Sequence, residues 1–484
     1  MLGGAGRSIR CRDRRRSRRN GRLSTPPTRL VQPRLMVTVR EMPGQRYKTY
    51  LLALLMIILA SNFFDRVALG VVLESIKADL ELSDTQLGFL GGLAFAAFYA
   101  LMGIPIARWA DRGNRVTIIA VTTALWSAMV ALCGTATGFL QLLLIRVGVA
   151  VGEAGCVPPA HSLLADYFQR SERPRAVGIY TMGAPLSLVF GYFAAGWLNQ
   201  LYGWRATFVI LGLPGLALAA LARFTLKEPR GVVIEPPTTP RLTEVWRMLW
   251  GNMTFRRMLA CLAISQFFMY GVLQWLPAFF VRSYGMQTGA IGTWFAASAG
   301  LCGVFGNYLG GALASRFAAG NEAAQLKGLS ALWGLHGILS ACIYLVSGHQ
   351  AAFVCLGLAI MALAATNGPF FATIQTLVPS TMRAMSVAII SLFTNLIGLG
   401  LGPLAVGALS DATHRWFGAE SLRYALLALS PGFLWCMRQI WRASYTVGTD
   451  IAAAQAVSLC DDVKRMSSSA LESAASAHER RSMA

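Results

Sequence analysis

Charge is scarce in this sequence. Only 13% of its 484 residues are Asp, Glu, Lys or Arg, and 55% are hydrophobic. Soluble domains carry about 25% charged residues, so a water-soluble globular protein is excluded. The nine cysteines show no CxxC or Cys/His spacing, and neither an HExxH nor a GxSxG motif occurs. We therefore expect no disulfide framework, no metal site, no cofactor and no enzymatic activity.

Positive charge is concentrated at the amino end. Residues 1–48 contain 14 Lys or Arg against two acidic residues, so they carry +12 of the net charge of +21. Such a segment has too little apolar surface to fold, and it can attract nucleic acid or anionic lipid. We interpret it as a disordered, solvated cytoplasmic tail and expect no nucleic-acid partner. Alternatively, the true start is Met36 or Met42, because both precede the first apolar run.

Apolar runs fill most of the remaining sequence. About 20 apolar residues cross the ~30 Å hydrocarbon core of a bilayer, and twelve runs reach this length. A segment rich in proline and charge, 223–257, separates the first six from the last six, and it cannot continue as a membrane-spanning helix. The predicted spans are Thr49–Leu73, Thr85–Ile106, Val116–Ala136, Gly138–Ala160, Pro174–Leu198, Trp204–Ala222, Met258–Val281, Gly289–Ala314, Gly328–Ser347, Ala351–Leu377, Ala384–Leu409 and Leu422–Ile440.

This division predicts an all-α integral membrane protein with twelve transmembrane helices in two six-helix bundles, 49–222 and 258–442. The linker is 223–257, and 443–484 is a second cytoplasmic tail. Cytoplasmic loops are enriched in Lys and Arg. With the amino terminus inside, the inner loops hold 16 Lys and Arg and the outer loops hold five. We expect a monomer in the lipid bilayer of a bacterial inner membrane, with both termini in the cytoplasm.

The two halves repeat weakly. An offset of 204 residues places Gly88 on Gly292, and near the end of each half an offset of 211 places Gly196 on Gly407. Two parallel six-helix repeats, with a binding site at their interface, are the architecture of a large class of transporters.

The loop between the second and third spans reads "ARWADRGNR", from Ala107 to Arg115. It resembles the signature loop of the major facilitator superfamily. Asp111 can accept hydrogen bonds from backbone amides and pair with Arg112 or Arg115, which predicts a conformational latch between the halves. The alternative is an ordinary basic cytoplasmic loop. Asn114 stands where glycine is usual, and asparagine can take a left-handed turn conformation.

Four charged residues lie inside predicted spans, where each costs about 2.5 to 3.5 kcal/mol or more at the bilayer centre. Asp65 and Arg66 are in the first span, and Arg146 and Glu153 are in the fourth. Asp65 and Arg146 each lie eight residues from the outer end of their span, so we expect them at one depth. One interpretation is a buried Asp65–Arg146 pair that only locks packing. We favour another, in which arginine attracts an anion while Asp65 and Glu153 take up and release protons.

The equivalent positions of the second half are apolar, namely Met269, Leu356 and Leu363. That half instead offers aromatic and amide side chains. A cavity that is charged on one side and aromatic on the other suits an amphipathic anion, although core or lipid packing is the alternative for any single ring. The predicted substrate contacts are Arg146, Arg66, Phe268, Tyr270, Gln274 and Asn367.

Between Tyr50 and Arg442 the sequence resembles the spinster family of major facilitators. The resemblance rests on "NFFDRVALGVVLESIKADLELSDTQLGFLGG", on the loop with its asparagine, and on "RVGVAVGEAGCVPPAHSLLADYF". That family includes lysolipid and sphingolipid exporters. The resemblance implies that Asp65 is the protonation site and Arg66 its modulator. It also implies that Arg146 and Glu153 form the central pair and that Asp111 is the latch.

The anion:cation symporters for sugar acids have a similar Asp-Arg in the first span, and an Arg followed seven residues later by Glu in the fourth. The charges therefore do not separate the two families. We predict a proton-coupled secondary transporter that moves an anionic or amphipathic small molecule, such as a lysolipid or sphingolipid, by alternating access. Symport of a small organic acid is the alternative, and a membrane-embedded enzyme or receptor is a remote one.

Overall fold

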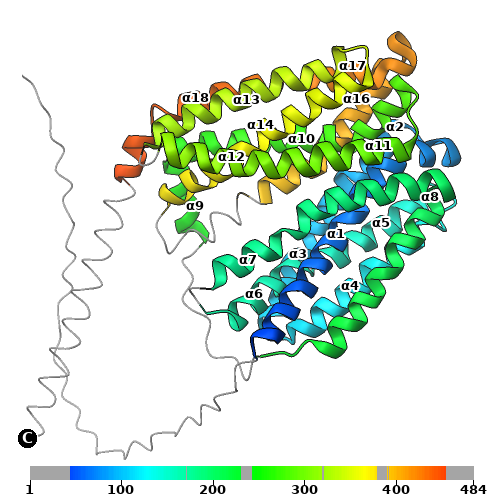
Figure 1. Cartoon of the computed structure of the whole chain (residues 1–484), viewed down its shortest axis with the longest axis horizontal. Coiled ribbons are helices and arrows are strands. Elements are labelled where there is room, and N and C mark those ends of the chain that lie inside the picture. The colour runs from blue at the N-terminus through cyan, green and yellow to red at the C-terminus, as the bar shows by residue number, and fades with distance from the viewer. Residues whose placement is uncertain are drawn as a thin grey trace, which may run out of the picture. The chain divides into compact units, whose positions relative to one another are not determined.

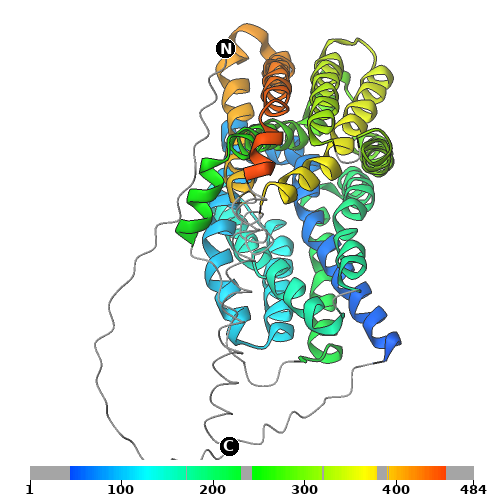
Figure 2. The ribbon, with the colours of Figure 1, turned by 90° about the vertical axis from the view of Figure 1, so that its left-hand side faces the viewer.

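The computed structural model describes residues 44–169, 172–229, 242–318, 321–378, 390 and 392–453. Within these ranges the chain is helical and contains no strand. Figures 1 and 2 show long helices gathered into bundles, with the first half in blue to green and the second in green to red. Most of both predicted tails, and residues 230–241 of the predicted linker, lie outside the described residues.

The first half begins near the amino end of the described chain. Its helices are α1 (Gln45–Leu80), α2 (Asp84–Gly91), α3 (Leu93–Arg112), α4 (Arg115–Cys133), α5 (Phe139–Glu153), α6 (Val157–Tyr167), α7 (Arg173–Thr181) and α8 (Gly183–Thr225).

The second half follows the short helix α9 (Leu242–Gly251). Its elements are α10 (Met253–Tyr284), α11 (Thr288–Phe295), the π-helix η1 (Ala296–Leu301), α12 (Cys302–Phe317), α13 (Glu322–Leu345), α14 (His349–Thr376), the π-helix η3 (Thr394–Leu401), α16 (Gly402–Phe417), the 3-10 helix η4 (Gly418–Glu420), α17 (Ser421–Leu429) and α18 (Pro431–Ala443).

The described helices make twelve passes. Ten helical runs are long and apolar enough to cross a membrane, and two of them, Arg175–Thr225 and Thr394–Ala443, are about 50 residues long. Each long run doubles back on itself, as Figure 1 shows for α8. The reversals lie at Gly203 and Gly418, with φ angles of 78° and 53°, which glycine adopts without the strain of a Cβ. The predicted all-α fold with two sets of six passes is confirmed.

Polar side chains fix where several passes begin. Ser83, Asn114 and Asn252 each accept a hydrogen bond from the backbone N–H three residues later, which satisfies an amide that has no partner within the helix. Asn114 has φ −76° and ψ 109° and caps α4. Asn114 thus does not adopt the left-handed conformation that asparagine can take, and its side chain serves as a helix cap.

The fourth pass is interrupted, although the sequence predicts a continuous span over Gly138–Ala160. α5 ends at Glu153, and α6 begins at Val157 with two prolines, Pro158 and Pro159, in its first turn. Proline fits the first turn because its missing N–H has no partner within the helix in any case. Glu153 therefore lies at a helix end in the interior of the first half.

Candidate functional site

Two ion pairs connect α1 with α5 inside the first half. The Nη1 of Arg146 donates to Oδ2 of Asp65 at 2.7 Å, and the Nε of Arg66 donates to Oε2 of Glu153 at 2.9 Å. Asp65, Arg146 and Glu153 are at most 2% exposed. Asp65 and Arg146 meet, in agreement with the depth expected from their positions in the two spans.

The pairing differs from the one that the family resemblance implies. Arg146 and Glu153 are two turns apart on α5, about 10 Å along the helix. Each therefore pairs with α1, whose consecutive residues Asp65 and Arg66 supply one charge of each sign. The expectation of a central Arg146–Glu153 pair is replaced by two crossed pairs.

Aromatic rings of α3 complete this charge cluster. The guanidinium of Arg66 lies 4.7 Å from the ring centre of Phe95 and 5.2 Å from that of Tyr99, while the guanidinium of Arg146 lies 5.2 Å from Phe95. An aromatic face stabilises a cation that is removed from water. The sequence interpretation missed both rings. Their spacing of four residues on a span next to two intramembrane arginines is the signal that would have found them.

Both carboxylates keep one oxygen available. Within the described residues, Oδ1 of Asp65 and Oε1 of Glu153 are buried without a hydrogen-bond partner. Either carboxylate can therefore take a proton on that oxygen while its ion pair stays intact. A cavity of about 10 Å³ beside Asp65, lined also by Ser61 and Ser127, has room for about one water molecule.

The equivalent place in the second half is an apolar cavity of about 60 Å³. Met269, Leu356 and Leu363, the counterparts of Asp65, Arg146 and Glu153, all line it. The repeat therefore brings equivalent positions together in both halves, with ionic residues in the first and hydrocarbon in the second.

The four predicted contacts of the second half have different surroundings. Phe268 packs on Phe433 within that half, at 5.3 Å between ring centres. The Nε2 of Gln274 donates to the backbone oxygen of Leu87 at 3.4 Å, in the other half. Tyr270 packs against the hydrophobic core, and the Nδ2 of Asn367 donates to Asn307 at 3.2 Å. Phe268 and Asn367 thus contact residues of their own half, whereas Gln274 contacts the first half.

The predicted latch is described only in part. The side chains of Asp111 and Arg112 lie outside the described residues. Arg115 has no exposed side-chain surface and pairs with Glu228 and Asp166, and it donates to the backbone oxygen of Ser162 at 2.9 Å. Arg115 therefore joins α4 to α6 and to the residues after α8, all in the first half. The sequence interpretation missed Glu228 because it lies in the predicted linker.

We expect Glu228→Gln to lower the free energy of unfolding by about 2 to 4 kcal/mol, because Arg115 then stays buried with one carboxylate fewer. The measurement is the apparent Tm of the purified protein in detergent. The control is Asp79→Asn. Asp79 pairs with Arg205, and both side chains are more than 40% exposed. Exposed pairs contribute less than about 1 kcal/mol, so equal Tm losses would contradict a structural role for Glu228.

Comparison with known proteins places this geometry among transporters. A sequence profile of the Major Facilitator Superfamily matches residues 55–435. An MFS-type efflux pump of Mycolicibacterium smegmatis is 34% identical over 377 residues, covering 76% of this chain and 86% of that protein. A probable L-galactonate transporter of Escherichia coli K12 is 24% identical over 413 residues, covering 81% and 88%. The crystal structure of a bacterial homologue of the human lysosomal transporter Spinster, inward-facing and unoccupied, matches with a TM-score of 0.76 and 32% identity, covering 84% and 99%.

Proposed function

Because the chain belongs to the Major Facilitator Superfamily, we propose that it is a proton-coupled secondary transporter of an anionic or amphipathic small molecule. The observation that carries this proposal is the buried cluster of Asp65, Arg66, Arg146 and Glu153. Buried charges cost free energy, so charges that are kept inside a membrane span indicate a function. The cluster combines two cations, which attract an anion, with two carboxylates that each keep an oxygen available for a proton.

The charge balance of the cluster links anion binding to proton binding. Two arginines and two carboxylates sum to zero, so an anion bound to Arg146 leaves one net negative charge in a region of low dielectric constant. A proton on Asp65 or Glu153 restores neutrality. Since an uncompensated buried charge costs several kcal/mol, anion and proton bind more strongly together than separately. The pair then crosses the membrane together when the two halves rearrange.

Transport by alternating access requires that the halves close one end of the protein at a time. The inter-half hydrogen bonds of Asp411, Asn199 and Gln200 gather where α2 and α11 begin. With the amino terminus in the cytoplasm, as the loop arginines indicate, this is the outer end. In this orientation the described state is closed to the outside.

Two substrate classes remain, and different observations favour them. The rings of Phe63, Phe95 and Tyr99 near Arg66 favour an amphipathic anion such as a lysolipid, in keeping with the resemblance to a Spinster homologue. The names of relatives that carry sugar acids, including L-galactonate, favour a small organic acid. The first class is our principal proposal.

A thermal-shift screen separates these classes. Purified protein is heated with lysophospholipids, with sphingoid phosphates, or with L-galactonate and D-glucarate. A ligand at 100 times its Kd stabilises the folded state by about 2.7 kcal/mol, so we expect a raised Tm with the first two groups and little change with the sugar acids. Uncharged glycerides of equal chain length are the control. Equal stabilisation by glycerides and lysophospholipids would contradict anion recognition.

A further inference from the structure

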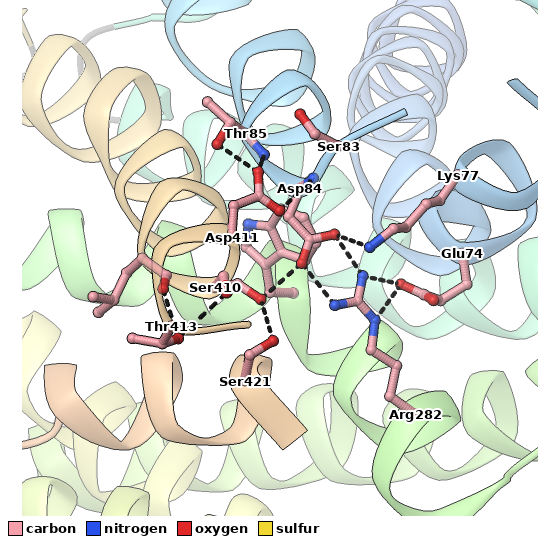
Figure 3. Close-up of polar contacts among 12 residues, drawn as sticks. Glu74, Lys77, Ser83, Asp84, Thr85, Arg282, Ser410, Asp411, Thr413 and Ser421 are labelled. Carbon is pink, nitrogen blue, oxygen red and sulfur yellow. Dashed lines mark hydrogen bonds and ion pairs between the residues drawn. The ribbon is translucent and has the colours of Figure 1, made fainter. Parts of the chain in front are cut away.

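At the end where α2 begins, a carboxylate of the second half caps a helix of the first. Asp411, on α16, accepts hydrogen bonds from the backbone N–H groups of Asp84 at 3.2 Å and Thr85 at 2.7 Å, and from the Thr85 hydroxyl at 2.6 Å (Figure 3). The first N–H groups of a helix have no partner within it. Asp411 therefore satisfies the start of α2 across the boundary between the halves.

A second contact at this end has the same form with the halves exchanged. Gln200, on α8 in the first half, accepts a hydrogen bond from the backbone N–H of Gly289 at 2.9 Å, in the first turn of α11. The neighbouring Asn199 donates to the Thr288 hydroxyl at 3.3 Å. Here the first half caps a helix of the second.

The internal repeat relates these two contacts residue by residue. The offset of 204 carries Thr85 to Gly289, and the offset of 211 carries Gln200 to Asp411. The same offsets relate two further contacts, because Ser410 donates to Asp84 as Asn199 donates to Thr288. Two caps at equivalent positions, one in each direction, point to a feature built into the duplicated fold.

Glycines let the capped helices approach closely at both contacts. A Cβ at Gly407 would collide with the backbone oxygen of Asp84, and one at the equivalent Gly196 would collide with that of Thr288. At each contact the backbone of the glycine-bearing helix touches the backbone of the capped helix. The capping side chains therefore lie within hydrogen-bond distance of the helix start in the opposite half. Separating the halves at this end must break both caps.

The two contacts differ in charge. Arg282, on α10, binds Asp84 with Nη1 at 2.7 Å and Glu74 with Nη2 at 2.6 Å, and Lys77 also binds Asp84 at 2.6 Å (Figure 3). The α2 contact is thus ionic, and its capping group is a carboxylate at a helix N-terminus, where negative charge is favoured. The hydrogen bonds of Asn199 and Gln200 at the α11 contact come from neutral side chains.

We infer that Asp411 and Gln200 are paired positioning residues of the transport cycle, each closing this end of the protein by capping a helix of the opposite half. Asp411 supplies the closure that weakens with salt, and Gln200 supplies closure that does not depend on ionic strength. This inference rests on the proposed alternating access, because only a cycle that opens this end gives the caps a function.

The test is the distance across this end, measured by pulsed electron–electron double resonance. The spin labels are attached at Glu81→Cys and Ala419→Cys, in a protein lacking its native cysteines. Both label positions are exposed. We expect Asp411→Ala to raise the ratio of open to closed protein about tenfold and to weaken the salt dependence of this ratio, while the pairs of Arg282 with Asp84 and Glu74 keep part of that dependence. We expect Gln200→Ala to raise the same ratio and to retain the salt dependence. We expect Gln200→Glu to lower the ratio of open to closed protein.

The control is Thr413→Ala. Thr413 lies on the same helix, and its hydroxyl donates to the backbone of that helix, at Leu409 and Ser410. If Asp411→Ala fails to fold, Asp411→Asn and Gln200→Glu still test the inference. Both variants keep an oxygen that accepts from the helix start, and they change the charge of the cap. If the wild-type protein opens, but Asp411→Ala and Gln200→Ala give the same ratio of open to closed protein as Thr413→Ala, the inference is overturned while alternating access stands. A single unchanging distance in all proteins, wild type included, overturns alternating access as well.

Discussion

Asp65→Asn is expected to reduce transport driven by a pH gradient by about 100-fold or more, the scale on which a positioned proton-transferring side chain acts. Asparagine keeps an oxygen that accepts from Arg146, but it cannot bind or release a proton. Substrate exchange at equal pH on both sides needs no net proton movement, so it should continue within a few-fold of wild type. The measurement is uptake and counterflow in proteoliposomes.

Two variants make this result specific to Asp65. Asp79→Asn, on the same helix, removes an exposed carboxylate that pairs with Arg205, and we expect it to transport as wild type. Glu153→Gln tests the second carboxylate of the cluster. Full coupling to pH in Asp65→Asn, with loss of coupling in Glu153→Gln, would transfer the proton role to Glu153. Full coupling in both variants would contradict proton transport by this cluster.

The passes and their charges were predictable because they depend on local sequence. An apolar run of 20 residues and a charge within it are visible without any partner, and the shared depth of Asp65 and Arg146 needs only the helical rise. The choice of partners was not predictable in this way. Which carboxylate meets Arg146 depends on how α1 and α5 rotate against each other, and that is set by packing along the whole helix.

The contacts between the halves show the same limit more strongly. Arg282 counted only as a basic residue of an outer loop, and Asp411 was not singled out. The partners of these two residues, Asp84 and Thr85, lie more than 190 positions away along the chain. The repeat offsets, however, were visible in Gly88 and Gly196 and already related the two crossings. Equivalent positions in a duplicated sequence therefore carry structural information that single motifs lack.

Arg146→Gln is expected to abolish substrate binding and to lower the free energy of unfolding by about 3 to 5 kcal/mol, the cost of leaving one member of a buried ion pair alone. Asp65 is 2% exposed, and it accepts a charge-assisted hydrogen bond of 2.7 Å from Arg146. Loss of binding alone would not separate a binding role from misfolding. The double variant Asp65→Asn/Arg146→Gln therefore carries the argument, because it removes both charges and leaves two amides that can hydrogen-bond.

If Arg146 only locks the packing of α1 against α5, the double variant should regain both stability and binding. If Arg146 holds the anion, the double variant should recover a stability within about 1 to 2 kcal/mol of wild type, because it leaves no uncompensated buried charge. It should nevertheless show no thermal shift with any ligand that stabilises wild type. Arg205→Gln, which removes an exposed arginine of the same half, is the control for both measurements. Wild-type binding by the double variant would move the anion site to Arg66, whose guanidinium lies against Phe63, Phe95 and Tyr99.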